Sequence, residues 1–150
     1  MPVNNVRGAA VQNRFVAATA VALAVAGLGA CTSRPSTPLS GTASITVNGT
    51  DANFHIVKCS QREWTRTIDI GGNFSGASLI VDMGAQPAST ESVHIRNLGG
   101  FNGMYARGDG EQADTSMSGD RFTVTGTANG FKTDKPNEAA SAPFKIVVTC

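Results

Sequence analysis

The chain is poor in aromatic residues and has no excess of charge of either sign. Its 150 residues include one tryptophan, one tyrosine and seven phenylalanines, and 12 Lys and Arg face 11 Asp and Glu. Arg7 and Arg14 are the only charged residues before position 31, so the rest of the chain holds 10 basic and 11 acidic residues. Nucleic-acid binding and polybasic lipid binding both need clustered Lys and Arg. The composition therefore favours neither.

Motifs for catalysis and metal binding are also missing. The two histidines, His55 and His94, fall in different predicted strands, and no Ser, Cys or acid stands at a spacing that would build a catalytic group with either. We expect both histidines to face solvent. The alternative is a metal site that combines them with Asp69 or Asp82. The acidic turns after residue 107 lack the spacing of a calcium loop. We predict no enzyme, no metal and no cofactor.

One long apolar run is present, close to the N-terminus. Residues 15–27 (FVAATAVALAVAG) follow a polar segment with two arginines and no acid, the layout of an export signal. Extended to Ala30, the run has 16 residues, short of the roughly 20 that span a bilayer. It ends in Leu28-Gly29-Ala30-Cys31, which we interpret as a bacterial lipobox, where a lipoprotein is lipidated and cleaved.

The chemistry of lipidation explains the residue types of the lipobox. Only a thiol at the first mature position can be alkylated by a diacylglyceryl group, and small residues such as Gly29 and Ala30 fit the peptidase that cuts before it. Cys31 then becomes the mature N-terminus and carries diacylglyceryl and N-acyl chains. The alternative is an ordinary signal peptide with an incidental or buried cysteine.

The segment after Cys31 has the composition of a tether. Residues 32–42 (TSRPSTPLSGT) contain two prolines, one glycine and six hydroxyl residues, with only Leu39 apolar. Such a stretch cannot bury a core and is expected to be disordered. O-linked sugars and an undecorated linker both remain open. We predict a signal peptide over 1–30, a lipidated N-terminus and tether over 31–42, and one domain over 43–150.

From Ala43 onward, apolar residues alternate with polar ones, which is the period of strands. No window shows the 3.6-residue apolar stripe of a helix. Strands are expected near residues 43–47, 52–59, 64–70, 77–83, 93–98, 104–107, 115–118, 122–127 and 142–150, with a long polar connection over 129–141. We predict an all-β fold, a single antiparallel β-sandwich or curved-sheet domain.

Two cysteines remain once Cys31 is assigned to lipid. Cys59 and Cys150 form an even pair in an exported chain, which favours a disulfide. It would close a loop of about 90 residues and stabilise the fold by roughly 4–5 kcal/mol on the chain-entropy model. Two free thiols or a metal site are the alternatives, although the spacing is not that of a zinc motif.

The few aromatic residues near turns are the candidates for recognition. Trp64, Phe101 and Tyr105 lie close to predicted turns, where aromatic side chains often anchor partners. In a chain with so few rings, packing in the core or at a sheet edge is the competing interpretation, and it applies equally to Phe74 and Phe131.

Short segments along the domain resemble a known family. They are Ile45-Thr46-Val47-Asn48-Gly49, Lys58-Cys59-Ser60-Gln61, Arg66-Thr67-Ile68-Asp69-Ile70, His94-Ile95-Arg96-Asn97, Gly100-Phe101-Asn102-Gly103, Phe122-Thr123-Val124-Thr125-Gly126, Lys135-Pro136-Asn137 and Phe144-Lys145-Ile146. With the lipobox and Cys150, this order is similar to that of mycobacterial lipoproteins of the LpqH lipoprotein-antigen family. The resemblance implies a lipid-anchored envelope protein with a β domain and one disulfide, and no enzymatic activity. It also implies a glycosylated linker and host innate recognition through the acylated N-terminus, but the tether here is shorter and interrupted by proline.

We therefore predict a non-enzymatic lipoprotein, anchored through acylated Cys31 at the extracytoplasmic face of the cell membrane. The expected partners are the membrane, through the covalent lipid, and host innate-immune receptors; the protein is expected to be monomeric and not to bind nucleic acid. The alternative is a carrier of an envelope lipid or another small apolar ligand, which would need a cavity of several hundred Å³.

Overall fold

The computed structural model describes residues 41–150, which belong to one compact unit of the chain. The predicted signal peptide, the lipobox and most of the predicted tether lie outside the described residues. The first strand begins at Thr42, one residue earlier than the alternation in the sequence predicts, and Gly41 before it is already buried.

Ten strands make up the described part of the chain: β1 (Thr42–Val47), β2 (Thr50–Phe54), β3 (Val57–Arg62), β4 (Thr65–Gly71), β5 (Gly76–Asp82), β6 (Ser89–Leu98), β7 (Phe101–Ala106), β8 (Asp114–Ser118), β9 (Arg121–Lys132) and β10 (Lys135–Thr149). Within residues 41–150 no helix is long and apolar enough to cross a membrane. The predicted all-β class is confirmed.

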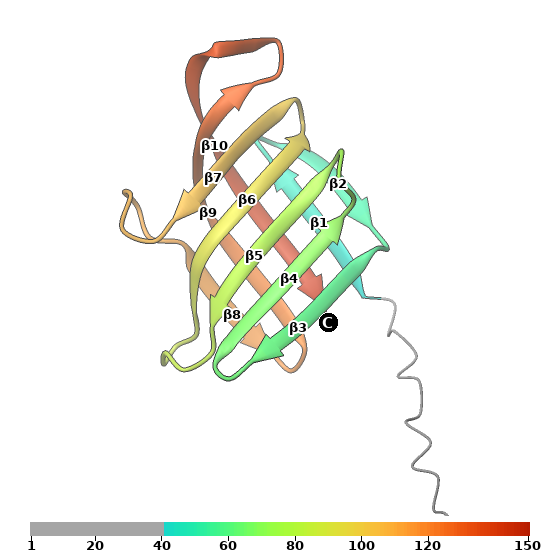
Figure 1. Cartoon of the computed structure of the whole chain (residues 1–150), viewed down its shortest axis with the longest axis vertical. Helices are drawn as coiled ribbons and strands as arrows, with labels where there is room; N and C mark the ends of the chain where they lie inside the picture. The colour runs from blue at the N-terminus through green and yellow to red at the C-terminus, as the bar shows by residue number, and fades with distance from the viewer. Residues whose placement is uncertain (1–40) are drawn as a thin grey trace, which may run out of the picture. The chain divides into compact units, whose positions relative to one another are not determined.

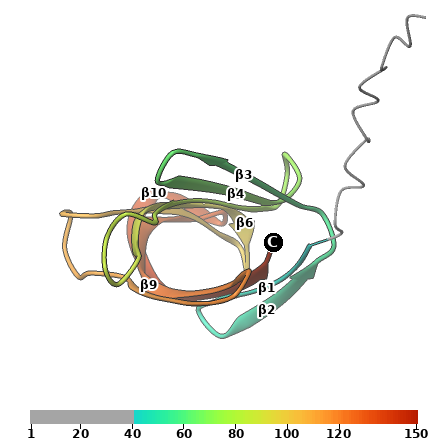
Figure 2. The same cartoon turned by 90° about the horizontal axis from the view of Figure 1, so that it is seen from below.

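All strand pairs are antiparallel and belong to one sheet, in the order β2-β1-β10-β9-β7-β6-β5-β4-β3, with β8 added beside β9. The sheet is rolled upon itself until it is nearly closed (Figure 1). Seen from below, β3 lies on one side of the opening and β1 and β2 on the other, with the C-terminus between them (Figure 2). Of the two predicted forms, the curved sheet describes this arrangement.

Along each strand, every second side chain faces the interior of the rolled sheet. On β10, Phe144, Ile146 and Val148 are buried, as the alternation predicts. The largest fully buried side chains come from six strands and include Ile45, Ile68, Ile70, Leu79, Ile95, Phe122 and Ile146. Burying each such side chain contributes about 1.5–3 kcal/mol, so this inner face holds the sheet in its rolled form.

Two predicted elements are wrong. The expected strand over 52–59 is broken at His55 and Ile56, and its halves become β2 and β3, the two edges of the sheet. The expected loop over 129–141 is instead the long β9–β10 hairpin. Its residues look like loop because they are almost all exposed on both faces, and Pro136 sits where the register shifts between Lys135 and Ala139, a place that tolerates proline.

Strand β7 pairs with β9 over only four residues, from Phe101 to Met104. Beyond that point β7 leaves β9, and β8 pairs with the lower part of β9 in its place. Side chains join β8 to β6, since the Thr90 backbone N–H and the Thr90 hydroxyl both lie within hydrogen-bond distance of the Thr115 hydroxyl, at 3.0 and 2.7 Å. The segment over 107–113 crosses the gap between β7 and β9.

Candidate functional site

The lipobox, Leu28-Gly29-Ala30 with Cys31, lies outside the described residues, so the structure gives no geometry for it. The geometry below concerns the domain that follows: its disulfide, its aromatic side chains and the cavities on its surface.

The disulfide predicted between Cys59 and Cys150 is confirmed. It joins β3 to the residue that follows β10, with 5.8 Å between the two Cα atoms. The backbone N–H of Cys150 also donates to the carbonyl of Asp120 at 2.9 Å, in the turn between β8 and β9. The bond therefore links β3, at one edge of the sheet, to the end of β10, the third strand from the other edge, across the opening.

Two of the three candidate recognition aromatics belong to the core. Phe101 and Tyr105 are 3% and 4% exposed, because both sit at inward positions of β7. The Tyr105 ring meets the Phe144 ring edge-on, with 6.2 Å between centroids, and the Tyr105 hydroxyl accepts a hydrogen bond from Ala113 N at 3.0 Å. The structure thus supports packing rather than recognition for this pair.

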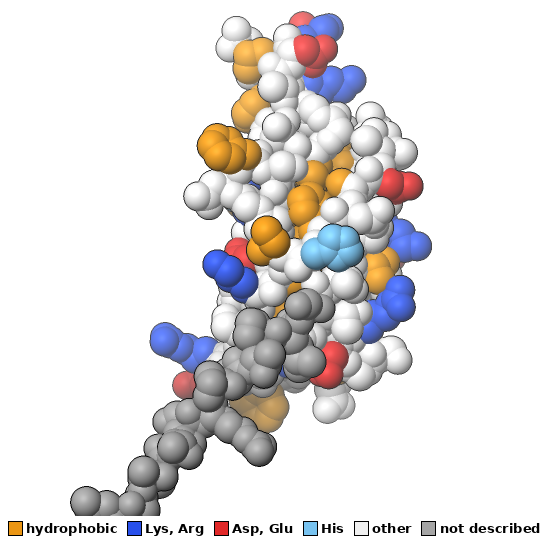
Figure 3. Space-filling view, turned by 90° about the vertical axis from the view of Figure 1, so that its right-hand side faces the viewer, with side chains coloured by type: hydrophobic (Ala, Val, Ile, Leu, Met, Phe, Trp, Pro, Cys, Tyr) orange, Lys and Arg blue, Asp and Glu red, His pale blue; other side chains and the backbone are white. Residues whose placement is uncertain are grey.

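Trp64 remains exposed. Its side chain is 69% exposed, in the turn between β3 and β4. Phe74, between β4 and β5, is 91% exposed, and Phe131 on β9 is 40% exposed. On the face drawn in Figure 3, hydrophobic side chains form small islands between polar atoms rather than one continuous patch.

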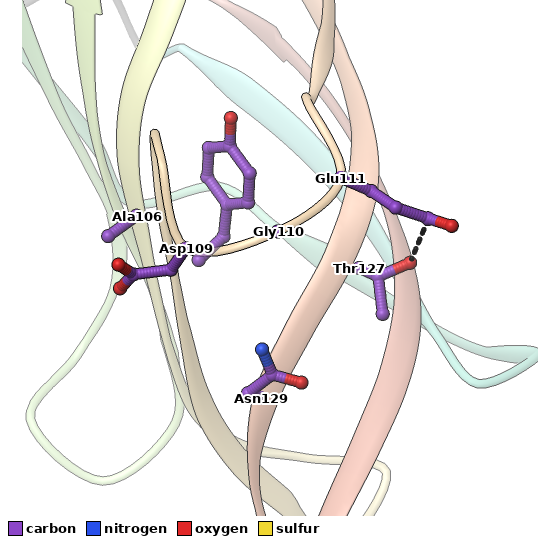
Figure 4. Close-up of a pocket in the computed structure, with 7 residues that line it drawn as sticks. Ala106, Asp109, Gly110, Glu111, Thr127 and Asn129 are labelled. Carbon is purple, nitrogen blue, oxygen red and sulfur yellow. Dashed lines mark hydrogen bonds between the residues drawn. The ribbon is translucent and has the colours of Figure 1, made fainter.

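A cavity of about 290 Å³ lies where β7 leaves β9 (Figure 4). Tyr105 and Ala106 line it from β7, Thr127 and Asn129 from β9, and residues 109–111 from the crossing segment. The Thr127 hydroxyl donates to Glu111 Oε2 at 3.5 Å. In Figure 4 the Asp109 carboxylate points away from that of Glu111, so the two acids do not converge on a common point.

Metal ligands are not assembled in this domain. Among residues 41–150, no group of three or more His, Cys, Asp or Glu side chains could hold a metal ion. His94 is exposed on β6 and His55 is exposed between β2 and β3. The acidic turns over residues 109–120 are exposed at each of their acids.

Three further cavities of the domain are also open to solvent. Three have volumes of about 240, 400 and 600 Å³ and are lined mainly by Ser, Thr, Asn, Gln and charged side chains. A pocket for an apolar ligand is lined predominantly by hydrophobic and aromatic groups. None of these four surface cavities has that lining, and the inward-facing apolar side chains pack against one another in one cluster.

The sequence analysis did not identify Arg66 as a charged residue that points inward. Arg66 has the same parity on β4 as buried Ile68 and Ile70, and its guanidinium carbon lies 5.6 Å from the centre of the Phe122 ring. Its Nε is buried and has no hydrogen-bond partner among the described residues. The period-two pattern could have revealed this, since it places Arg66 on the core face.

Comparison with known proteins identifies the family. The sequence profile of the Mycobacterium 19 kDa lipoprotein antigen matches residues 36–150. The chain belongs to the 19 kDa lipoprotein antigen family. A protein of Mycobacterium indicus pranii named as a lipoprotein is 66% identical over 93% of this chain and 99% of its own length.

Two further members of the 19 kDa antigen family show how far the likeness extends. The lipoprotein named LppE of Mycobacterium tuberculosis is 34% identical over 92% of this chain and 99% of its own length. The lipoprotein LpqH of Mycobacterium avium is 32% identical over 71% of this chain and 66% of its own length. The resemblance inferred from short segments is confirmed, and the chain matches LppE over nearly the whole of both proteins.

Within the 19 kDa antigen domain, the segments that carried the resemblance are structural. Lys58-Cys59-Ser60-Gln61 lies in β3 and holds one half of the disulfide, and Phe144-Lys145-Ile146 lies in β10 between β1 and β9. These two segments therefore belong to the rolled sheet and to the closure of its opening.

Proposed function

We propose that the protein is a non-enzymatic lipoprotein of the mycobacterial cell envelope, anchored to the membrane through acyl chains on Cys31. The observation that carries the proposal is the match to a lipoprotein antigen family in a chain where Leu28-Gly29-Ala30 precedes a cysteine at the end of an apolar run. Its relatives are named as lipoproteins and not as enzymes.

The energy of such an anchor depends on the number of chains. Each buried methylene contributes about 0.8 kcal/mol, so one acyl chain binds reversibly, whereas two or three hold the protein firmly. Diacylglyceryl attachment to the Cys31 sulfur supplies two chains, and N-acylation of the new terminal amine supplies a third. The domain then acts at the extracytoplasmic face as a monomer, with the acylated N-terminus as the part that a host innate-immune receptor would recognise.

No observation favours the alternative of a lipid carrier. The four surface cavities have mainly polar linings, and the apolar side chains of the inner face form one packed cluster. We therefore do not propose a second function.

The test is the replacement of the one thiol that the lipobox provides. We expect Cys31→Ala to leave the full chain unlipidated and uncut by the lipoprotein peptidase when it is expressed in a mycobacterium, because alanine has no sulfur to alkylate. Intact mass and partition into a detergent phase measure both effects. Ser36→Ala, which keeps the lipobox intact, is the matched control and should mature as the unaltered chain does. Normal maturation and detergent partition of Cys31→Ala would contradict the proposal.

A further inference from the structure

Two exposed apolar side chains stand at the end of the sheet where β4 turns into β5. Ile56, between β2 and β3, is 61% exposed, and Phe74, between β4 and β5, is 91% exposed. The backbone N–H of Gly71 donates to the carbonyl of Ile56 at 2.8 Å, so the loop that carries Phe74 begins beside Ile56. The N–H of Gly72 donates to the carbonyl of Ser75 at 3.0 Å and closes this loop around Phe74. The two side chains therefore belong to one small region of the surface.

The first described residue of the chain lies beside the same region. A Cβ on Gly41 would lie 2.8 Å from Val57 Cβ, so Gly41 touches the start of β3, next to Ile56. The starts of β1 and β3 lie close together in Figure 1 and in Figure 2. Val57 pairs with Ile70, at the end of β4 that leads to Phe74. The point at which the chain enters the domain therefore adjoins both exposed apolar side chains.

The segments that carry these side chains hold no acidic residue. Residues 54–57 (FHIV) and 71–76 (GGNFSG) contain neither Asp nor Glu. One cation lies beside them, since Arg96 Nη2 donates to the carbonyl of Gly72 at 3.5 Å. Apolar side chains enter the boundary between headgroups and acyl chains, and lipid phosphates attract cations. The turn at the other end of β3 and β4 instead places the acid Glu63 directly before Trp64. The composition of the Ile56 and Phe74 region therefore suits contact with lipid.

The length of chain before Gly41 lets this region reach the membrane. Residues 31–40 separate the proposed lipid on Cys31 from Gly41, and a segment of that length spans at most about 35 Å. The part of the domain next to Gly41 meets the bilayer with the least extension of this segment. Trp64 lies beyond the far end of β3, about 17 Å or more from Val57. The anchor therefore favours contact through the region of Ile56 and Phe74.

We propose that Ile56 and Phe74 dock the domain on the surface of the phospholipid bilayer that holds the acyl chains, with both side chains just below the headgroups. This inference rests on the proposed function, because it needs the anchor on Cys31. Exposed apolar side chains are stabilised when lipid covers them. The tether raises their local concentration at the surface, so two side chains suffice where an unanchored domain would need more. Docking depends on apolar contact, and we expect it to persist at high salt.

A single tryptophan moved to the loop after β4 is the probe. The double variant Phe74→Trp with Trp64→Phe is matured and lipidated in a mycobacterium. It is then reconstituted into phosphatidylcholine vesicles, with or without phosphatidylcholine that carries a spin label near its headgroup. We expect emission at shorter wavelength than that of a water-exposed tryptophan, and quenching by the labelled lipid at both low and high salt. Sedimentation with the vesicles reports anchoring separately.

The unaltered lipidated protein is the matched control, because Trp64, its only tryptophan, stands at the opposite end of β4. We expect its emission to be unshifted and far less quenched. Adding Ile56→Ser to the double variant should reduce the quenching. Ile80→Ser, a change on β5 at a side chain that is 39% exposed, should leave it unaltered.

Each other outcome contradicts the docking. Anchored protein in which the tryptophan of Phe74→Trp is quenched no more than Trp64 would overturn the docking and leave the anchor intact. Quenching that Ile56→Ser leaves unchanged would overturn the part assigned to Ile56. A blue shift that the labelled lipid does not quench would show that residues 32–40 or a second copy cover the site, and would also overturn the docking. Failure of the lipidated protein to bind vesicles would overturn both proposals.

Discussion

At the scale of single residues, the turn that carries Trp64 is held in an unfavourable backbone conformation. Glu63 has φ of 53°, in the left-handed region, while Trp64 after it does not. A two-residue hairpin turn with positive φ at its first central residue usually has glycine there. The Gln61 side chain supports the turn by donating to the carbonyl of Glu63 at 3.1 Å. The strain lies beside the exposed side chain of Trp64.

We expect Glu63→Gly to raise the free energy of unfolding by about 1 kcal/mol, because glycine adopts this conformation without a clash of Cβ. Urea unfolding followed by Trp64 emission measures the change. Asn48→Gly is the control: Asn48 has φ of 49°, but asparagine tolerates this region, so the gain should be smaller. A loss of stability in Glu63→Gly would contradict the interpretation of strain.

Arg66 shows a second compromise at this scale. Leaving a buried N–H without an acceptor costs about 1–3 kcal/mol, and stacking a guanidinium on a ring returns about 0.5–2 kcal/mol. The Nε of Arg66 is a buried N–H without an acceptor among the described residues, and the guanidinium of Arg66 stacks over the Phe122 ring. The two effects are similar in size, so the position is tolerated without being a source of stability.

At the scale of elements, the joint between β7 and β9 depends on two glycines. Gly103 and Gly130 face each other in the register of these strands. A Cβ on Gly130 would collide with the carbonyl oxygen of Asn102, and one on Gly103 would lie 2.5 Å from the Phe101 ring. The close approach lets the Phe101 ring fold over Gly103 and lets the strands meet before they separate at the cavity.

We expect Gly130→Ala to lower the free energy of unfolding by about 1–3 kcal/mol, as overpacking does, because backbone rather than a mobile side chain must move. Chemical unfolding measures the loss. Gly72→Ala is the matched control, since a Cβ there meets no atom within 4 Å and the residue has no positive φ. Equal stability of the two variants would show that the β7–β9 approach is looser than the structure describes.

At the scale of the whole molecule, the rolled sheet holds the first and the last strand of the domain next to each other. Strand β1 pairs with β10 along its whole length, and the disulfide ties β10 to β3 across the opening between the edges. Both edge strands are short and polar: β2 carries Asp51, and β3 carries Lys58 and Arg62. Charged edges discourage pairing with other chains.

We expect reduction of the disulfide to lower the free energy of unfolding by about 4–5 kcal/mol, since the bond spans 91 residues and constrains the unfolded chain. Hydrogen exchange should accelerate first in β3, which has a single neighbour in the sheet. Intact mass with and without reductant verifies the state of the thiols. Free thiols on the purified mature protein, or an unchanged unfolding midpoint after reduction, would contradict this role.

The sequence by itself determined the class of the fold, the strands with strict alternation, the disulfide pair and the family. The reason is that these properties are local or compositional: Ile45 and Val47, or Phe144 and Ile146, show which face is buried without reference to any other strand. The cysteine pair follows from number and compartment. The lipobox is likewise a property of contiguous residues, and its role stays a prediction.

Only the tertiary structure decided which elements meet. The break at His55 and Ile56 divides what the sequence predicts as one strand, because apolar and polar residues alternate through the segment without interruption. Only the closure of the sheet places its two halves, β2 and β3, at opposite edges. The β9–β10 hairpin looks like loop because little of its outer part is buried. Exposure of Trp64 and burial of Phe101 and Tyr105 were undetermined for the same reason: a ring near a turn packs or protrudes according to neighbours distant in the chain.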